Sequence, residues 1–293
     1  MAEYILSAFA DEAGSTVEEQ ISALKDNGIH YIEPRSFWGK GILTLSDEEL
    51  LKIKNALDDA GIKVNSLGSP IGKYPITESF DNHLTDFMRA IEICKILNTE
   101  NMRIFSFYIP KGEDPMKYSD EVIRRMKKLS QIAKESGITL NHENEKDIFG
   151  QTPTEVDFLV KNLSDIKFIF DGANYIMSGC DVTSGMNASI KNFGYFHIKD
   201  AVFESQTIVP VGDGESCYEK MLSLANDKLD RRIFLTLEPH LHIFDAFHSI
   251  DSGELRGKYS FSNNREAFDF AAAALKKMLT KEGYKEYNGI WKK

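Results

Sequence analysis

Short apolar runs alternate with amphipathic stretches along almost the whole chain. The runs have the length and β-branched content of buried strands, and the stretches between them have helical spacing. Strands are expected at residues 4–10, 29–34, 62–67, 102–107, the start of 138–150, 168–170, 195–198 and 233–237. Helices are expected from 16 to about 25, between 46 and 61, within 80–97, at about 116–136, from 152 onward, around 182–191 and 218–227, and near 264–279.

The helix boundaries carry local signals that support this alternation. Three helices begin with a capping box, in which a Ser or Thr is followed three residues later by Glu. The pairs are Thr16 with Glu19, Ser46 with Glu49, and Thr152 with Glu155, and Pro153 adds a favourable first helical residue. Gly28 and Gly61 end two helices directly before a β-branched residue, about one βα unit apart.

Eight strands that alternate with helices predict a parallel sheet covered by helices. A chain of 293 residues with eight such units favours a closed (β/α)8 TIM barrel, as one domain over residues 1–293. The sequence contains no GxGxxG or Walker A pattern, which argues against a dinucleotide fold or a P-loop fold. The longest irregular stretches, 68–77 and 239–258, are expected to be loops or lids at the active face.

Four of the expected strands end in an oxygen or nitrogen donor. Glu143, Asp171, His197 and Glu238 each follow or close an apolar run. In barrels of this kind the active site lies at the carboxyl ends of the strands. Two Glu, one Asp and one His suit a single Mn²⁺, Mg²⁺, Co²⁺ or Zn²⁺ ion and do not choose among them.

Each donor has an ordinary structural explanation when it is taken alone. An Asp at a strand end is commonly a cap, and a lone His is commonly a packed, hydrogen-bonded residue. The two glutamates are harder to explain in this way, because burying an unpaired carboxylate is costly. The four residues taken together therefore favour a metal site.

The motifs H-E-N, F-D-x-x-N, F-H-I-K-D and L-x-L-E-P-H, in this order, resemble those of the xylose isomerase-like TIM-barrel superfamily of sugar phosphate isomerases and epimerases. The resemblance extends from SAFADEA to LTLEPH, which is nearly the whole chain. It implies that Glu143, Asp171, His197 and Glu238 bind one divalent metal ion. It also implies that Glu143 and Glu238 form the catalytic acid/base pair.

The implied chemistry is proton transfer next to a carbonyl group. A metal ion on the carbonyl and a neighbouring hydroxyl stabilises the enediolate and so acidifies the C–H bond. One carboxylate removes the proton, and the other returns it on the opposite face or at the neighbouring carbon. The resemblance thus implies a metal-dependent isomerase or epimerase of a small sugar, polyol or sugar phosphate.

Several departures from the family pattern leave the substrate open. Asn174 stands where many epimerases have a His, Glu145 replaces a His after strand five, and no Arg follows His197 closely. These differences argue against a ketose 3-epimerase. Candidate substrate contacts are Arg35, His142, Asn174, Lys199 and His240.

Other polar and aromatic residues near the strand ends have open roles. Lys73 and Arg103 are expected to be surface charges. Phe9, Trp38 and Phe107 could stack on a sugar ring or pack in the core. The VGDGE segment at 211–215 lacks the P-loop Lys, so it is interpreted as a loop after strand seven.

Composition limits the partners. A net charge of −10 argues against nucleic acid as the main partner, and no apolar run approaches the ~18 residues of a membrane helix. Three separated cysteines and the absence of a basic signal region are typical of a reducing cytoplasm. The expected partner is a small sugar or polyol. Homo-oligomers are frequent in the family, and no residue decides whether this chain forms one.

Four other functions compete with the isomerase hypothesis. A lyase that dehydrates a keto-inositol-type substrate would use the same residues. A metal-dependent nuclease shares the barrel but uses a three-metal cluster and a basic face, which 7 His and the acidic charge disfavour. A non-catalytic sugar-binding barrel would not need two facing glutamates. An NAD-linked oxidoreductase lacks its phosphate-binding fingerprint.

Overall fold

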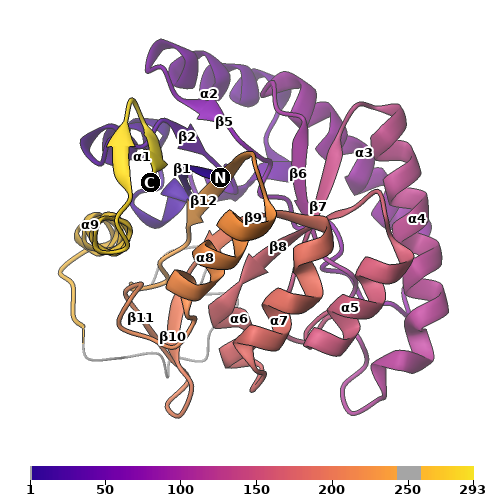
Figure 1. Cartoon of the computed structure of the whole chain (residues 1–293). Coiled ribbons are helices and arrows are strands. Elements are labelled where there is room, and N and C mark those ends of the chain that lie inside the picture. The colour runs from indigo at the N-terminus through magenta and orange to yellow at the C-terminus, as the bar shows by residue number, and fades with distance from the viewer. Residues whose placement is uncertain (1, 243–258) are drawn as a thin grey trace.

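The computed structural model describes residues 2–242 and 259–293, and these form a ring of parallel strands surrounded by helices (Figure 1). The strands of the ring are β1 (Glu3–Ala8), β2 (Tyr31–Ile32), β5 (Lys63–Val64), β6 (Asn101–Ile104), β7 (Thr139–Glu143), β8 (Lys167–Asp171), β9 (Phe193–Ile198) and β12 (Arg232–Leu237). Strand β1 pairs with both β2 and β12, and a parallel bridge between Leu67 and Met102 joins the segment after β5 to β6. The predicted (β/α)8 barrel is confirmed.

The outer helices lie where the periodicity predicts them. They are α1 (Val17–Asp26), α2 (Asp47–Asp59), α3 (Phe80–Ile96), α4 (Ser119–Glu135), α5 (Pro153–Asn162), α7 (Val182–Ser189), α8 (Tyr218–Lys228) and α9 (Asn264–Lys281). Short 3-10 turns occur at η1 (Ala10–Glu12), η2 (Ile42–Thr44), η3 (Pro115–Tyr118) and η4 (Ile190–Asn192). All three capping boxes are confirmed, because each N-cap hydroxyl accepts the amide of its Glu and that carboxylate accepts the N-cap amide.

Several strands are shorter than the apolar runs that predict them. The run at 29–34 yields only the two residues of β2, and the run at 62–67 yields only β5. Both runs continue as extended chain that turns into loops above the barrel. The loop at 68–77 contains no helix or strand, as expected, whereas 243–258 of the predicted 239–258 loop lies outside the described residues.

One helix and six strands have no counterpart among the predictions. The helix is the short α6 (Gly172–Met177) directly after β8. The strands form three antiparallel hairpins, β3 (Ser36–Phe37) with β4 (Lys40–Gly41), β10 (Asp200–Val202) with β11 (Thr207–Val209), and β13 (Lys285–Tyr287) with β14 (Ile290–Lys292). Strand β14 also pairs with the start of β1, which places the two ends of the described chain side by side in Figure 1.

The VGDGE segment closes on a carboxylate. Asp200 accepts the backbone amides of Gly212 at 2.9 Å, Gly214 at 3.2 Å and Ser216 at 2.9 Å. A Cβ atom at Gly214 would lie 2.3 Å from Asp200 Oδ1, so this close approach requires glycine. The interpretation of 211–215 as a loop after strand seven is confirmed.

The barrel interior is partly polar at the level of Thr236, which pairs with Ser7 on one side and with His197 on the other. The Ser7 hydroxyl donates to Asn65 Oδ1 at 2.6 Å, and Asn65 Nδ2 donates to Thr236 Oγ1 at 3.4 Å. All three side chains are buried and lie on different strands or their extensions. Mutual hydrogen bonds therefore satisfy these polar groups inside the ring.

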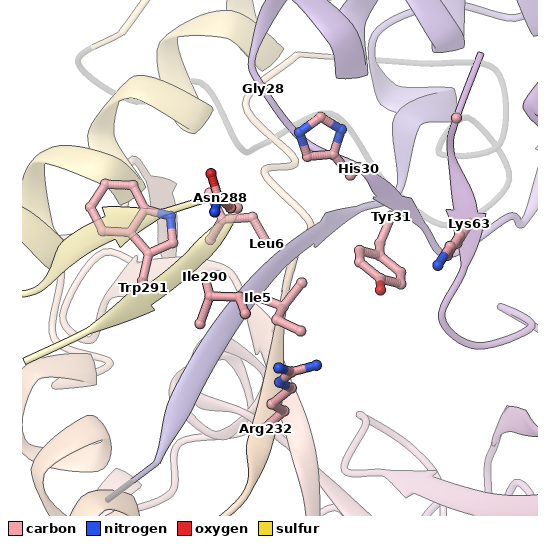
Figure 2. Close-up of a pocket in the computed structure, with 12 residues that line it drawn as sticks. Ile5, Leu6, Gly28, His30, Tyr31, Lys63, Arg232, Asn288, Ile290 and Trp291 are labelled. Atoms are coloured by element: carbon pink, nitrogen blue, oxygen red, sulfur yellow. The ribbon is translucent and has the colours of Figure 1, made fainter.

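A cavity of about 300 Å³ opens at the amino-terminal ends of the strands (Figure 2). Its lining includes Ile5, His30, Lys63 and Arg232, which lie at or just before strand starts, together with Trp291 of β14. It contains none of the predicted metal ligands. Within the described residues, no helix combines the length and the apolar character needed to cross a bilayer.

His83 on α3 provides a test of the packing under the 68–77 loop. The buried ring accepts the amide of Gly72 through Nε2 at 3.2 Å and contacts Tyr74 and Phe107. Burial lowers the pKa of His83 from 6.5 to about 4. The folded protein therefore takes up a proton less readily than the unfolded chain. Its stability should fall as the pH drops from about 6.5 to about 4, with this group contributing up to roughly 3 kcal/mol.

Urea unfolding at pH 7 and pH 4.5 measures this effect, with His83→Leu as the comparison. The variant should lose less stability between the two pH values, because one buried group no longer resists protonation. Equal pH dependence in both proteins would contradict this assignment.

Candidate metal and acid/base site

Four donors from neighbouring strands come together at the carboxyl end of the barrel. Glu143 and Asp171 are the last residues of β7 and β8, His197 lies near the end of β9, and Glu238 follows β12. Their ligand atoms all lie within 4.8 Å of one another, and all four side chains are buried. The parallel register places these residues at the same height in the barrel. Asp171 of β8 pairs with His197 of β9, and Thr236 of β12 pairs with His197 from the other side. The structure thus brings together the four predicted ligands, whose role stays a prediction.

His197 stands in the middle of the carboxylates. Its Nδ1 lies 2.9 Å from Glu143 Oε1 and 3.6 Å from Glu238 Oε2, while Nε2 faces Glu33 Oε2 at 3.4 Å. Burial alone would lower the pKa of His197, but the negative charges of Glu143 and Glu33 raise it to about 10. These carboxylates therefore favour the protonated, positively charged form of the ring.

Glu143 is held by a cation and an amide. Arg103 NH1 lies 3.3 Å from Oε2, and Asn174 Nδ2 donates to Oε1 at 3.4 Å. Burial would raise the pKa of Glu143, but His197 and Arg103 hold it at about 2. The expectation that Arg103 is a surface charge is wrong, because its side chain lies inside the barrel mouth and is almost fully buried. Lys73 instead pairs with Glu145 at 3.0 Å.

Asp171 caps the helix that follows its strand. Its Oδ1 accepts the amide of Asn174 at 2.9 Å, and the side chain of Asn144 bonds both the amide and the carbonyl of Asp171. Its Oδ2 faces Lys199 Nζ at 3.0 Å. Burial raises the pKa of Asp171 to about 7, although Lys199 acts against this. The cap fixes one oxygen and leaves the other directed to the site.

Glu238 contacts three basic groups besides His197. Arg35 NH1 lies 3.0 Å from Oε1, Lys199 Nζ lies 3.4 Å from Oε2, and His240 Nε2 lies 3.4 Å from Oε1. Burial would raise the pKa of Glu238, but Lys199 and His240 keep it well below its usual range. The carboxylate is therefore ionised at neutral pH.

Two acids that the sequence analysis did not single out support Arg35. Asp11 binds the guanidinium through both oxygens at 2.9 Å, and Glu12 lies 3.3 Å from it. Glu12 also accepts the amide of His240 at 2.7 Å. The acidic SAFADEA segment after the first strand was the available signal, because it ends at the same barrel edge as the predicted ligands.

The predicted substrate contacts divide into two groups. Arg35, Asn174, Lys199 and His240 border the four donors, as described above. His142 does not, because neighbouring residues of a strand point to opposite sides and Glu143 points inward. His142 lies against Phe168 and bonds Ser106 at 2.7 Å, and a Cβ atom at Gly150 would lie 2.8 Å from its ring. This corrects the placement of His142, which lies outside the ring of strands.

The three aromatic residues considered as stacking candidates lie in three different environments. Phe9 lies within the site, with Arg35 Cζ at 4.6 Å and Arg103 Cζ at 5.0 Å from its ring, and it meets His197 edge to face at 5.1 Å. Phe107 packs in the core against His83. Trp38 is 38% exposed and has a positive φ of 55° in the β3–β4 hairpin. Phe9 therefore orients charged groups, and only Trp38 presents an open ring.

The sequence matches the family model described as "Xylose isomerase-like TIM barrel" over residues 21–242. The chain belongs to this family. A search of curated proteins finds no match.

Solved structures of the same fold extend over nearly the whole chain. D-allulose 3-epimerase from Methylomonas sp. is 16% identical, with 96% of this chain and 100% of that chain covered and a TM-score of 0.71. The IOLI protein with a bound zinc atom is 15% identical, with 95% and 99% covered and a TM-score of 0.72. The probable 3-DHS dehydratase AsbF from Bacillus anthracis is 14% identical, with 94% and 99% covered and a TM-score of 0.68.

In this xylose isomerase-like barrel, the donors fit a divalent ion. Six linked carboxylates face three Arg or Lys side chains, which leaves three negative charges if all nine groups are ionised and the His197 ring is neutral, as a metal-binding imidazole must be. The acids are Asp11, Glu12, Glu33, Glu143, Asp171 and Glu238, and the cations are Arg35, Arg103 and Lys199. Within the described residues, Asp171 Oδ2 and both ring nitrogens of His197 have no hydrogen bond of standard geometry. A divalent cation would offset two charges and bind Asp171 Oδ2 and the Nδ1 lone pair of His197, the ring nitrogen that faces Glu143.

Proposed function

We propose that this protein is a metal-dependent isomerase or epimerase of a small sugar, polyol or sugar phosphate. The observation that carries the proposal is that Glu143 and Glu238 approach the same ring nitrogen of His197, at 2.9 Å and 3.6 Å. Two ionised carboxylates thus flank one point, with Asp171 close beside them. Two carboxylates that face one position can remove a proton from a substrate carbon held there and return a proton to it.

The residues that would hold the ion are Glu143, Asp171, His197 and Glu238. Bound there, a divalent ion would polarise a substrate carbonyl and an adjacent hydroxyl. The oxygen-rich donor set accepts Mn²⁺, Mg²⁺, Co²⁺ or Zn²⁺. The IOLI protein, which has the same fold, holds zinc.

The glutamates move the proton. Before a metal ion binds, His197 and Arg103 lower the pKa of Glu143 despite its burial. Lys199 and His240 lower the pKa of Glu238 in the same way, so both carboxyls are ionised. The glutamate that acts as proton donor must therefore first take up a proton from solvent. One glutamate accepts the proton from carbon. The other, in its protonated form, gives a proton to the opposite face of that carbon, or the first returns its proton to the neighbouring carbon. In the route that uses both glutamates, the donor is reloaded from solvent between turnovers, so solvent hydrogen enters the product. In the route that uses one glutamate, solvent hydrogen enters when the carboxyl exchanges its proton before it returns it.

The bordering side chains would bind substrate oxygens. Lys199 Nζ, between Asp171 at 3.0 Å and Glu238 at 3.4 Å, can donate a further hydrogen bond to a hydroxyl or carbonyl oxygen. Asn174, Arg35 and His240 lie around the same group. We propose that these four residues orient the polyol, with the exposed ring of Trp38 available at the rim.

A dehydratase is the second candidate, because the same carboxylates could remove a proton next to a leaving hydroxyl. The fold shared with the probable 3-DHS dehydratase supports keeping this alternative. A nuclease with a three-metal cluster fits less well. The additional donor group in the described residues, Glu12 with His240, shares Glu238, and the Arg35 guanidinium lies 3.3 Å from Glu12.

The test is turnover in D₂O with a panel of ketoses, inososes and their phosphates, before and after removal of metal by a chelator. The proposal expects deuterium in the product without loss of water, and activity that disappears with the chelator and returns with Mn²⁺, Co²⁺, Mg²⁺ or Zn²⁺. A dehydrated product would select the lyase. Full activity after complete metal removal would refute the metal-dependent mechanism.

A further inference from the structure

Glu33 is a buried carboxylate next to the site that the proposed chemistry does not use. It follows β2 and its side chain points into the barrel, fully removed from solvent. The Tyr195 hydroxyl donates to Oε1 at 2.8 Å. Its Oε2 has no hydrogen bond of standard geometry to any described residue. A buried carboxylate is expensive without partners, so this half-satisfied oxygen needs an explanation.

The atom that faces the free oxygen of Glu33 is His197 Nε2, at 3.4 Å. This nitrogen also has no hydrogen bond of standard geometry within the described chain. The other ring nitrogen, Nδ1, faces Glu143 at 2.9 Å. The two nitrogens of one imidazole therefore face two different environments: Nε2 faces a single carboxylate, and Nδ1 faces the cluster of candidate ligands.

The ring has little freedom to change this orientation. Phe9 meets it edge to face, with centroids 5.1 Å apart and planes at 82°, and Tyr195 meets it at 5.5 Å and 60°. Tyr195 thus contacts both members of the pair, through its hydroxyl to Glu33 and through its ring to His197. Tyr195 and His197 lie on the same side of β9, because strand side chains alternate.

We propose that Glu33 is a positioning residue, which accepts the Nε2–H of His197 and is itself held by Tyr195, so that the Nδ1 lone pair points at Glu143, Asp171 and Glu238. An imidazole can offer either nitrogen to a ligand, and a carboxylate on one nitrogen selects the other. What Nδ1 binds rests on the proposed function. The orientation itself rests on the contacts of Glu33.

The test is long-range ¹H–¹⁵N NMR of the His197 ring, with and without Zn²⁺, together with a Zn²⁺ titration. In the wild-type protein with Zn²⁺, Nδ1 should carry the metal and Nε2 the proton. Glu33→Gln, which keeps the shape but weakens the acceptor, should lower Zn²⁺ affinity roughly 10- to 100-fold. Tyr195→Phe should act in the same direction by a smaller factor.

Ser7→Ala is the matched control. Ser7 is equally buried in the barrel, but its hydroxyl donates to Asn65 at 2.6 Å, so its removal should leave the His197 signals and Zn²⁺ affinity unchanged. Zinc on Nε2, or a Glu33→Gln variant with wild-type affinity and wild-type ring shifts, would overturn the inference. If Glu33→Gln does not fold, Tyr195→Phe carries the same comparison.

Failure of the proposed function would look different. If the wild-type protein binds no Zn²⁺, the metal mechanism is lost, but the Nε2–H signal of the metal-free protein still tests Glu33. An upfield shift or loss of that signal in Glu33→Gln, with no change in Ser7→Ala, would support the positioning role. An unchanged signal would refute it.

Discussion

Glu238→Gln is expected to lower turnover by about 10³-fold or more while the protein remains folded. The amide cannot exchange a proton with carbon, and loss of one general acid or base typically costs 10²- to 10⁴-fold. It also weakens one ligand of the proposed ion. Glutamine has the same size, and Arg35 at 3.0 Å can still donate to its carbonyl oxygen, so the packing should survive. Steady-state kinetics measures the loss of turnover, and circular dichroism measures whether the variant remains folded.

Glu18→Gln is the control for this experiment, since Glu18 is exposed on α1 and makes none of the contacts described for the site. It should have wild-type kinetics. Wild-type turnover in Glu238→Gln would remove Glu238 from the mechanism. Loss of folding in that variant would instead make it uninformative about turnover, and Glu143→Gln, held by Arg103 and Asn174, would then take its place.

His197→Ala is expected to weaken binding of a divalent ion by more than about 100-fold, because the central nitrogen donor of the group is deleted. Loss of a residue that only supports a ligand already costs 10- to 100-fold, so loss of a ligand should cost more. Isothermal titration with Zn²⁺ or Co²⁺ at constant pH measures the change.

His30→Ala provides the comparison, because His30 is exposed and lines the cavity at the opposite end of the barrel. It should bind the ion as the wild-type protein does. An unaltered titration of His197→Ala would show that His197 is not a ligand, and the four-residue assignment would then have to be abandoned.

The order of elements and the four donors could be predicted because both depend on local patterns. Apolar runs, capping boxes and helix-ending glycines are properties of neighbouring residues. The direction of each side chain is not a property of neighbouring residues, because it depends on strand register. His142 was misplaced for this reason, and Arg103 and Glu33 could not be assigned to the barrel interior from the sequence.

One missed element had a usable signal. The β13–β14 hairpin turns at Asn288 and Gly289, both with positive φ, and Asn-Gly between two short β-prone runs is typical of a two-residue hairpin turn. In contrast, α6 and the β10–β11 hairpin follow strand ends where polar residues suit either loops or short elements. Their formation depends on contacts such as the capping of α6 by Asp171.

The candidate site and the β13–β14 hairpin lie at opposite ends of the barrel. Six-residue strands such as β1 and β12 separate them by about 20 Å. The β13–β14 hairpin, which pairs with the start of β1, and the cavity beside it lie at one end. The four candidate metal ligands lie at the other end. A surface anchor or fluorescent label attached to the β13–β14 turn should therefore leave substrate entry unobstructed, which makes this turn the natural handle for immobilising the protein.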